Sequence, residues 1–237
     1  MALSPEETRR YARHLVLKGV GGEGQQKLKA VRVLVVGAGG LGSPLIAYLA
    51  AAGVGTIGVV DDDTVSLSNL QRQIVHRSDG QGITKVESAK NFVAALNPFV
   101  ELVPHVLRVD AQNVASLVDG YDLVLDGTDN FATRKLVAEA CQNAGKPLVS
   151  GAVSMFDGQV TVFRPSGPQF SDLYPQDPDD VDLPACELVG VLGAVTGVVG
   201  TLMAMEAIKL VTGLGEPLVG RLLLYDGRAA RFTELSY

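Results

Sequence analysis

The segment VRVLVVGAGGLG, residues 31–42, decides the fold of this 237-residue chain. Its first six residues form a near-continuous β-branched run, which is typical of a strand covered on both faces. Gly37, Gly39 and Gly42 then follow in the pattern Gly-x-Gly-x-x-Gly, and an apolar helix runs on to about Ala52 and stops at Gly53. Such glycines let the backbone approach a phosphate at the positive end of a helix. The segment therefore predicts a nucleotide-binding strand, turn and helix.

The rest of the N-terminal half alternates between helix-like and strand-like patterns. We expect helices over 4–17, 85–96 and 113–118, and a further helix that follows residue 130 and ends at about residue 144. We expect strands over 56–60, 100–107, 123–125 and 147–149. The first helix begins at Ser4-Pro-Glu-Glu7, which has the residues of a capping box. Repeated alternation of this kind predicts an α/β fold with a Rossmann-like, doubly wound sheet that is parallel in this half.

The C-terminal half has a different pattern. Phe156-Asp-Gly-Gln159 and Tyr225-Asp-Gly-Arg228 are both hairpin signals flanked by β-prone residues, so we expect antiparallel strands to extend the sheet. Between them, residues 164–187 carry five prolines and six acids, which predicts a mobile loop with too little apolar content to pack. We expect a single domain with a helical arm (1–30), a nucleotide-binding part (31–152) and a C-terminal part (153–237).

Composition limits the classes of function. The net charge of −6 argues against non-specific binding to nucleic acid or anionic membranes. Two cysteines exclude a disulfide framework and a four-thiolate zinc site. The first ten residues lack the apolar core of a signal peptide, so we expect a cytoplasmic protein.

One apolar segment is long enough to raise the question of a membrane span. Residues 188–205 contain no charge over 18 residues, the lower limit for crossing a bilayer, but four glycines favour a buried helix instead. The spacing of Gly193 and Gly197 would allow another helix to approach closely, within the chain or in a dimer.

Polar and charged residues follow several of the predicted strands. Asp61 ends the second strand, 22 residues after Gly39, where an acid can bind ribose hydroxyls. Arg72 lies in the loop past Asp61, Lys85 begins the next helix, and Asp126 and Asp129 lie beyond a later strand. In a doubly wound sheet all these loops emerge on one side. Cations that neutralise a triphosphate and a carboxylate that holds Mg²⁺ are what adenylation requires. The glycine pattern alone does not separate ATP from a dinucleotide, and it is not a P-loop.

These residues lie within motifs that resemble the ubiquitin-activating-like adenylyltransferases of the MoeB/ThiF/HesA family. The resemblance runs from about Arg10 to Leu235. Its motifs are Tyr11-Ala-Arg-His14 and residues 37–42, 61–73, 85–87, 126–130, 149–152, 157–160 and 200–209. The resemblance implies ATP- and Mg²⁺-dependent adenylation of the C-terminal glycine of a ubiquitin-like sulfur carrier (MoaD- or ThiS-like), with release of pyrophosphate. A separate donor would then supply sulfur.

The resemblance also implies a role for each matching residue. Asp61 would bind the ribose, Asn69 would lie near the α-phosphate, and Asp129 would hold magnesium. Backbone at Gly39, Gly40 and Gly42 would face the nucleotide, Arg72 and Lys85 would bind phosphates, and Arg13 would reach the partner subunit's site in a homodimer. Simpler interpretations remain open: turn residues at 61 and 69, solvated charges at 72 and 85, a helix-surface arginine at 13, and helix capping by Asp129 or Asn130.

The two cysteines call for different interpretations. Cys141 is expected in the core. Cys186 matches a position where ThiF-like members can bond to the activated carrier and where MoeB-like members do not need the thiol, so both a chemical role and a bystander role stay open. Many relatives also bind zinc through two Cys-x-x-Cys pairs, one of which would fall at residues 170–173. Because cysteine is absent there, we expect no zinc and a looser loop.

Other functions remain as alternatives. A related enzyme could adenylate a tRNA or a peptide, and an NAD-dependent oxidoreductase or a non-catalytic scaffold could use the same glycine turn. The sequence does not identify the carrier or the pathway, whether molybdopterin, thiamine, tRNA thiolation or a secondary metabolite.

Overall fold

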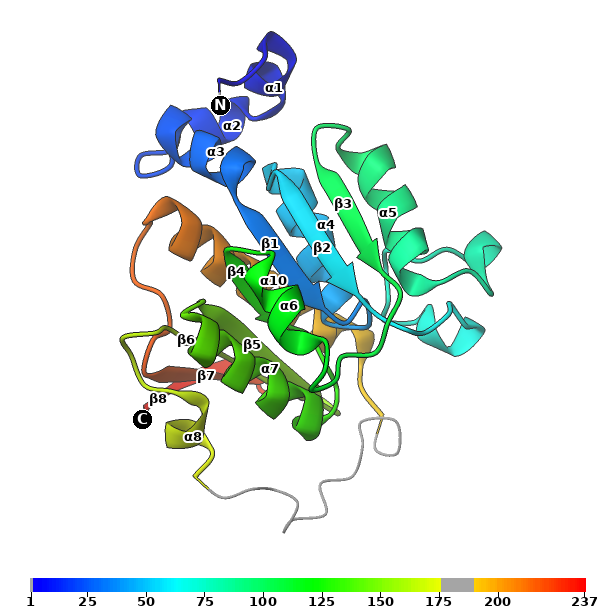
Figure 1. The fold of residues 1–237 in the computed structure, drawn as a ribbon, viewed down its shortest axis with the longest axis vertical. Helices are drawn as coiled ribbons and strands as arrows, with labels where there is room; N and C mark the ends of the chain where they lie inside the picture. Colours follow the sequence, from blue (N-terminus) through cyan, green and yellow to red (C-terminus); the bar gives the residue numbers. More distant parts are fainter. Residues whose placement is uncertain (1, 176–189) are drawn as a thin grey trace.

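A computed structural model describes residues 2–175 and 190–237, in which eight strands form one mixed sheet (Figure 1). The strand order is β3-β2-β1-β4-β5-β6-β7-β8. Strands β1 to β5 pair parallel with one another, whereas the pairs β5–β6, β6–β7 and β7–β8 are antiparallel. The predicted fold class is therefore confirmed. The strands are β1 (Arg32–Val36), β2 (Thr56–Val60), β3 (Glu101–His105), β4 (Leu123–Asp126), β5 (Leu148–Ser154), β6 (Asp157–Phe163), β7 (Arg221–Asp226) and β8 (Arg231–Ser236).

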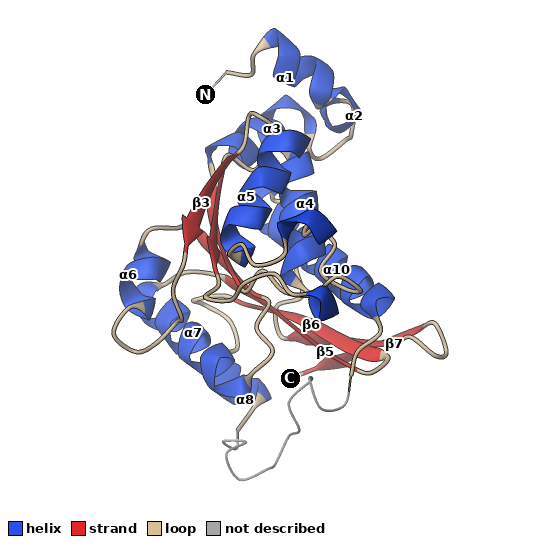
Figure 2. Cartoon of the chain, turned by 90° about the vertical axis from the view of Figure 1, so that its right-hand side faces the viewer, coloured by secondary structure: helices blue, strands red, loops and turns tan. Residues whose placement is uncertain are grey.

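Helices cover both faces of the sheet (Figure 2). One layer comprises α4 (Gly42–Ala52), α5 (Lys85–Leu96) and α10 (Gly193–Thr212), and the other comprises α6 (Val114–Asp119), α7 (Phe131–Ala144) and α8 (Phe170–Leu173). In β1, Val33 and Val35 pack into the first layer, whereas Leu34 and Val36 pack into the second. Burial on both faces explains why residues 33–36 of this strand are all apolar.

The N-terminal arm differs from the prediction. The capping box at Ser4 and Glu7 is present, but the single helix expected over 4–17 is divided into α1 (Pro5–Arg10) and α2 (Ala12–Leu15), and an unpredicted α3 (Gly21–Ala30) follows. The division falls at Tyr11, whose ring is buried and whose hydroxyl accepts a 2.9 Å hydrogen bond from Asn97 Nδ2. Burial of one ring against a distant residue overrides the local helical pattern.

The first hairpin turns two residues earlier than predicted. Ser154 pairs with Asp157, so Met155 and Phe156 form the turn, and Met155 has a φ of 49°. Gly158 instead lies inside β6, where a Cβ would come within 2.3 Å of Val199 on α10. Gly158 therefore allows α10 to pack closely on the sheet, because it has no side chain at the point of contact. The second hairpin is confirmed, with the Asp226 carboxylate accepting the N–H groups of Arg228 and Ala229.

The prediction of a mobile loop over 164–187 is wrong for the part that the structure describes. Phe170 on α8 is buried, and its ring centroid lies 5.4 Å from that of Phe131, 5.8 Å from that of Phe163 and 4.8 Å from that of Tyr174. Aromatic rings supply the apolar area that the count of prolines and acids overlooked. Residues 176–187, including Cys186, lie outside the described residues.

Helix α10 is the apolar segment that raised the question of a membrane span. Its length and composition satisfy the requirement for crossing a bilayer, with 44% of the apolar window buried. Val199 and Met203 are fully buried in the core, and a Cβ at Gly200 would lie 2.5 Å from Pro44 of α4. Close approach thus occurs within the chain at Gly200. Gly197 has no neighbouring atom within 4 Å of its Cβ position. These contacts describe the core helix of a folded domain.

Candidate functional site

The turn between β1 and α4 is tight because its glycines touch other backbone. Gly37 has a φ of 94°, and a Cβ there would lie 3.0 Å from the Gly127 carbonyl oxygen. A Cβ on Gly42 would lie 2.0 Å from the carbonyl oxygen of Gly37. No described residue accepts the N–H groups of Gly39 or Gly40. The turn therefore presents unpaired amides at the N-terminal end of α4, where an anion is favoured.

Asp61 follows β2 and lies beside this turn. Its Oδ2 accepts the Ala38 N–H at 2.8 Å, and its Oδ1 accepts the Asp63 N–H at 2.9 Å. Burial raises the pKa of the Asp61 carboxyl, and the nearby Lys85 ammonium offsets only part of that rise. The carboxylate is thus fixed in direction at the edge of the turn, as an acceptor of ligand hydroxyls must be.

The segment after the short helix η1 (Leu67–Asn69) lies across the turn. The Arg72 side chain passes over Gly40, where a Cβ would lie 3.5 Å from Arg72 Cδ, and Arg72 Nη1 donates to the Ser68 carbonyl at 3.0 Å. The first turn of α10 holds this segment in place, since a Cβ at Gly193 would meet the Gln71 carbonyl oxygen at 2.3 Å. Asn69 itself closes a local turn by accepting the Ser66 N–H.

Lys85 is not a solvated surface charge. It is the first residue of α5, its side chain is 7% exposed, and its Nζ lies 2.6 Å from Asp63 Oδ2 and 3.9 Å from Asp61 Oδ1. A buried ammonium between two carboxylates is held in a defined position. It therefore offers a placed positive charge next to the turn.

The loop after β4 also reaches the turn, through Gly127, whose N–H donates to the Val36 carbonyl. Within this loop Asn130 caps α7 by accepting the Thr133 N–H at 2.8 Å. Asp129 is exposed and makes no hydrogen bond or ion pair with residues 2–175 or 190–237. Capping is thus done by its neighbour, and the Asp129 carboxylate is available to a cation.

Asp126 has a structural role beneath that loop. It is fully buried and accepts Arg134 Nε at 2.9 Å, while Arg134 also donates to the carbonyls of Thr128 and Gly151. The ion pair ties α7, the loop and β5 together, so Asp126 does not face a ligand.

Arg13 is remote from all these groups in the same chain. It is exposed on α2, and the neighbouring Tyr11 packs on Gly53 and Asn97, at the C-terminal ends of α4 and α5. The glycine turn and Lys85 lie at the opposite ends of those helices, and α4 is 11 residues, or about 16 Å, long. Figure 1 shows the arm beyond the start of β1. Arg13 therefore takes no part in the glycine-turn site of its own chain.

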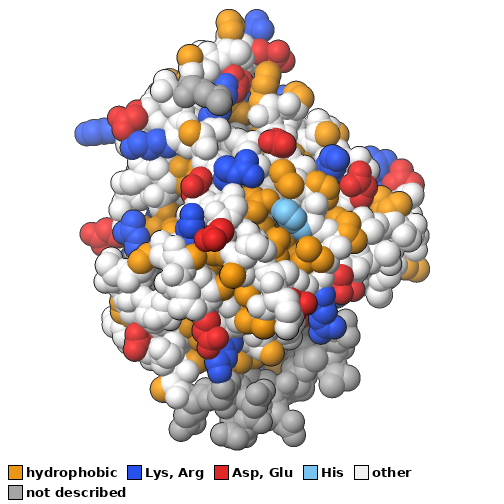
Figure 3. Space-filling view, in the orientation of Figure 1, with side chains coloured by type: hydrophobic (Ala, Val, Ile, Leu, Met, Phe, Trp, Pro, Cys, Tyr) orange, Lys and Arg blue, Asp and Glu red, His pale blue; other side chains and the backbone are white. Residues whose placement is uncertain are grey.

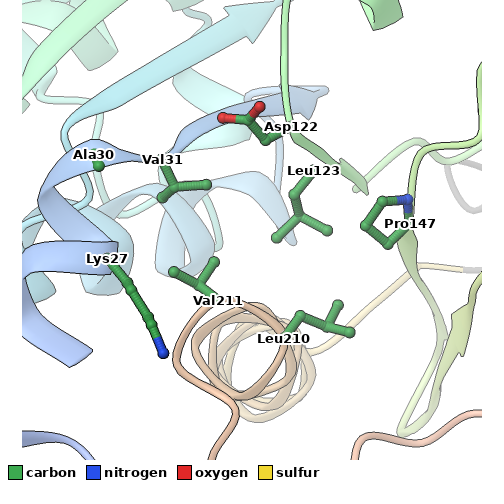
Figure 4. Close-up of a pocket in the computed structure, with 8 residues that line it drawn as sticks. All are labelled: Lys27, Ala30, Val31, Asp122, Leu123, Pro147, Leu210 and Val211. Carbon is green, nitrogen blue, oxygen red and sulfur yellow. The ribbon is translucent and has the colours of Figure 1, made fainter. Parts of the chain in front are cut away.

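The cysteine predicted in the core and an apolar groove at the start of β1 contribute no group to the glycine-turn site. Cys141 is buried in the core as predicted, and burial, reinforced by Asp126, raises the pKa of its thiol to about 12. Charges of both signs are interspersed over the face in Figure 3. Figure 4 shows the residues that line a groove of about 350 Å³ at the start of β1 and β4. The glycine turn follows the other end of β1. The lining of the groove is mainly apolar and comes from α3, α10 and the strand starts.

Three residues at the site were missed by sequence reasoning. Asp63 is the ion partner of Lys85, His76 donates to the Ala38 carbonyl, and Gln73 is buried beside Gly39 with its Oε1 lacking a partner among the described residues. Asp63 could have been found as the third acid of Asp61-Asp-Asp63. His76 and Gln73 carry no local signal, because their contacts depend on the fold.

Comparisons with known proteins agree on one family. The model described as the ThiF family matches residues 11–237. "Probable adenylyltransferase/sulfurtransferase MoeZ" of Mycobacterium tuberculosis is 50% identical over all of this chain and 60% of its own length, so the chain spans about three fifths of that relative. "SAMP-activating enzyme E1" of Haloferax volcanii is 49% identical, and "Sulfur carrier protein adenylyltransferase" of Thermus thermophilus 46%. Each matches all of this chain, which covers 88% and 89% of them respectively.

Solved structures show the same fold at low sequence identity. PaaA matches with a TM-score of 0.85 and 22% identity, over 99% of this chain and 75% of that one. E. coli MccB with MccA-N7isoASN matches with a TM-score of 0.82 and 20% identity, over 99% and 72%.

Proposed function

The chain belongs to the ThiF family, and from that premise we propose that it uses ATP to adenylate the C-terminal glycine of a ubiquitin-like, MoaD- or ThiS-like sulfur carrier protein. The carrier carboxylate attacks the α-phosphorus of ATP. The bond to the pyrophosphate group breaks, so that acyl-adenylate and pyrophosphate are the products. A separate protein then supplies sulfur to the activated carrier.

The observation that carries this proposal is the convergence of unlike groups on one turn. Four kinds of group lie around the end of β1: the amides of Gly39 and Gly40, which no described residue accepts, the Asp61 carboxylate, the Arg72 side chain and the buried Lys85 ammonium. A triphosphate needs several placed cations and amides, because its charge grows on the leaving pyrophosphate. Transfer of a hydride has no use for this set.

Each group then has a task that suits its chemistry. Asp61 accepts the ribose hydroxyls, and the turn amides with Arg72 and Lys85 take up charge on the phosphates. Asn69 lies in the segment over the turn, near the expected α-phosphate. Gly42 has no room for a side chain and keeps the turn closed.

The Asp129 carboxylate suits Mg²⁺, which prefers oxygen ligands and is usually shared between one or two carboxylates and phosphates. Its exposure and its lack of a partner among the described residues leave both oxygens available. Magnesium bound there would neutralise phosphate charge and orient the leaving group.

A homodimer would complete the site. Because Arg13 lies at the far end of its own chain, its guanidinium would serve the phosphates bound by the other subunit. The enzyme would act in the cytoplasm without zinc, nucleic acid or a membrane. A chemical role for Cys186 belongs to the later sulfur transfer, so adenylation should not need it.

Exchange of labelled pyrophosphate into ATP, with carriers ending in Gly-Gly, tests the proposal. We expect exchange that requires the carrier's final glycine and that Arg72→Ala and Asp129→Ala abolish, while Cys186→Ala leaves it intact. Arg77→Ala, an exposed arginine paired with Asp79, is the matched control and should exchange normally. Absence of exchange with every carrier, or normal exchange in Arg72→Ala or Asp129→Ala, would overturn the assignment.

Mixing two inactive variants tests the shared site. In a dimer of one Arg13→Ala and one Asp129→Ala subunit, one of the two sites holds both native residues. Equal mixing of exchangeable subunits should therefore restore roughly a quarter of wild-type activity. No recovery after verified subunit exchange would place Arg13 outside the site.

A further inference from the structure

One residue in the glycine turn, Ala38, is held from two sides. The Ala38 N–H donates to Asp61 Oδ2 at 2.8 Å, and the Ala38 carbonyl oxygen lies 2.9 Å from His76 Nε2. The other ring nitrogen, Nδ1, lies 2.9 Å from the Ser88 hydroxyl on α5. His76 is 6% exposed and takes no part in the catalytic roles described above.

The partners determine which nitrogen of His76 carries the proton. A carbonyl oxygen only accepts, so Nε2 must donate to Ala38, and in the neutral ring Nδ1 accepts from the Ser88 hydroxyl. Burial lowers the pKa of the imidazole, which keeps the ring neutral at physiological pH. Ser88 lies one turn after Lys85, so the same helix orients His76 and supplies the ammonium.

Holding this carbonyl fixes the direction of the next amide. The C=O of Ala38 and the N–H of Gly39 belong to one planar peptide unit and point in opposite directions. Asp61 holds the preceding N–H, and the Ser43 N–H holds the following carbonyl, that of Gly39, at 2.9 Å. Among the described residues, His76 alone bonds the peptide unit between them. The flanking glycine, Gly39, offers little steric resistance to rotation of this unit. The hydrogen bond from His76 is therefore what aims the Gly39 N–H, which no described residue accepts.

We propose that His76 is a positioning residue for nucleotide binding: by holding the Ala38 carbonyl, it directs the Gly39 amide toward a phosphate oxygen of ATP. This inference rests on the proposed function for the identity of the nucleotide. His76 therefore affects ATP affinity through the direction of the Gly39 N–H, in addition to any contribution that it makes to the stability of the fold.

Two substitutions at His76 separate the effect of its hydrogen bond from the effect of its side-chain volume. His76→Leu removes the hydrogen-bond donor but keeps a large side chain that fills the buried position. His76→Gln keeps a donor, the side-chain amide. His105→Leu is the matched control, because the His105 ring bonds the Tyr121 hydroxyl at 2.7 Å. The His105 backbone carbonyl, which the substitution keeps, accepts the Asp61 N–H at 3.2 Å. The dissociation constant for ATP is measured by calorimetry without carrier, and KM and kcat by pyrophosphate exchange.

We expect His76→Leu to weaken ATP binding about three- to tenfold, the effect of one hydrogen bond, and to raise KM for ATP more than it lowers kcat. His76→Gln should recover most of the affinity, and His105→Leu should bind as wild type. If His76→Leu does not fold, Ser88→Ala removes the partner of Nδ1 and should show a smaller loss in the same direction. Wild-type affinity in folded His76→Leu, or equal losses in His76→Leu and His105→Leu, would overturn the inference.

Hydrogen exchange in the free protein gives a readout that does not depend on ATP. Loss of the bond from His76 should speed exchange of the Ala38 amide, because the turn becomes mobile, while His105→Leu leaves that rate unchanged. Unaltered protection at Ala38 in His76→Leu would refute the positioning role even if adenylation itself proved to be the wrong activity. If wild type binds ATP but never exchanges pyrophosphate, the proposed function fails and the role of His76 is still tested.

Discussion

Replacing Gly42 with alanine tests how tight the turn between β1 and α4 is. The new Cβ would lie 2.0 Å from the Gly37 carbonyl oxygen, whereas ordinary contact begins at 3.4 Å. The new Cβ and the Gly37 carbonyl oxygen would have to separate by about 1.4 Å. Both atoms are attached directly to the backbone, so neither can move as the flexible end of a side chain can. Overpacking of this kind costs about 3 kcal/mol, the upper part of the usual range. For a chain of this size the melting temperature should fall by about 6–12 °C.

Thermal unfolding followed by circular dichroism measures this change, and calorimetry with ATP shows whether the displaced turn still binds nucleotide. Gly197→Ala is the matched control, because it also adds one methyl group to a glycine but nothing lies within 4 Å of that position. Since Gly197 is inside α10, alanine there should raise stability by up to about 1 kcal/mol. A Gly42→Ala protein that melts within about 2 °C of wild type would show that the turn is not sterically closed.

Three further predictions follow from burial. Burial raises the pKa of Asp61, and its ionised form accepts the ribose hydroxyls. As the pH is lowered, ATP affinity should therefore begin to fall at a higher pH than it would with an aspartate of ordinary pKa. Asp61→Asn should flatten the pH profile of ATP affinity measured by calorimetry, and an unchanged profile contradicts this role. Phe170→Ala should cost about 3–5 kcal/mol, measured by urea unfolding, whereas a loss below about 1 kcal/mol would mean that α8 is not packed on the core. With its pKa raised to about 12, Cys141 should resist iodoacetamide at neutral pH until urea unfolds the chain; equal labelling with and without urea in a Cys186→Ala background would disprove its burial.

Much of the fold was predictable because its signals are local. The strands at 32–36 and 56–60 and the helices at 42–52 and 85–96 have clear periodicity and clear ends, such as Gly53 with a φ of 81°. The errors occur where a distant contact prevails over a local pattern. Tyr11 interrupts the first helix because its hydroxyl meets Asn97, 86 positions later in the chain. Likewise Asp157-Gly158 resembles a turn, but α10 requires a glycine inside the strand.

The candidate site shows the same division. Asp61, Arg72, Lys85 and Asp129 could be chosen because their residue types and their places after strands suit nucleotide chemistry. The contacts that these residues make could not be predicted in this way. The closure of the glycine turn against Gly127, for instance, joins two loops that are 90 positions apart.

The sequence by itself determined the alternation of strands and helices, the glycine turn and the order of the charged residues, because these depend on properties of neighbouring residues. Only the tertiary structure decided that Lys85 is buried against Asp63, that His76 holds Ala38, and that Arg13 lies far from the glycine turn of its own chain. The physical reason is that burial and hydrogen bonding are set by packing between segments, and packing is a property of the whole fold.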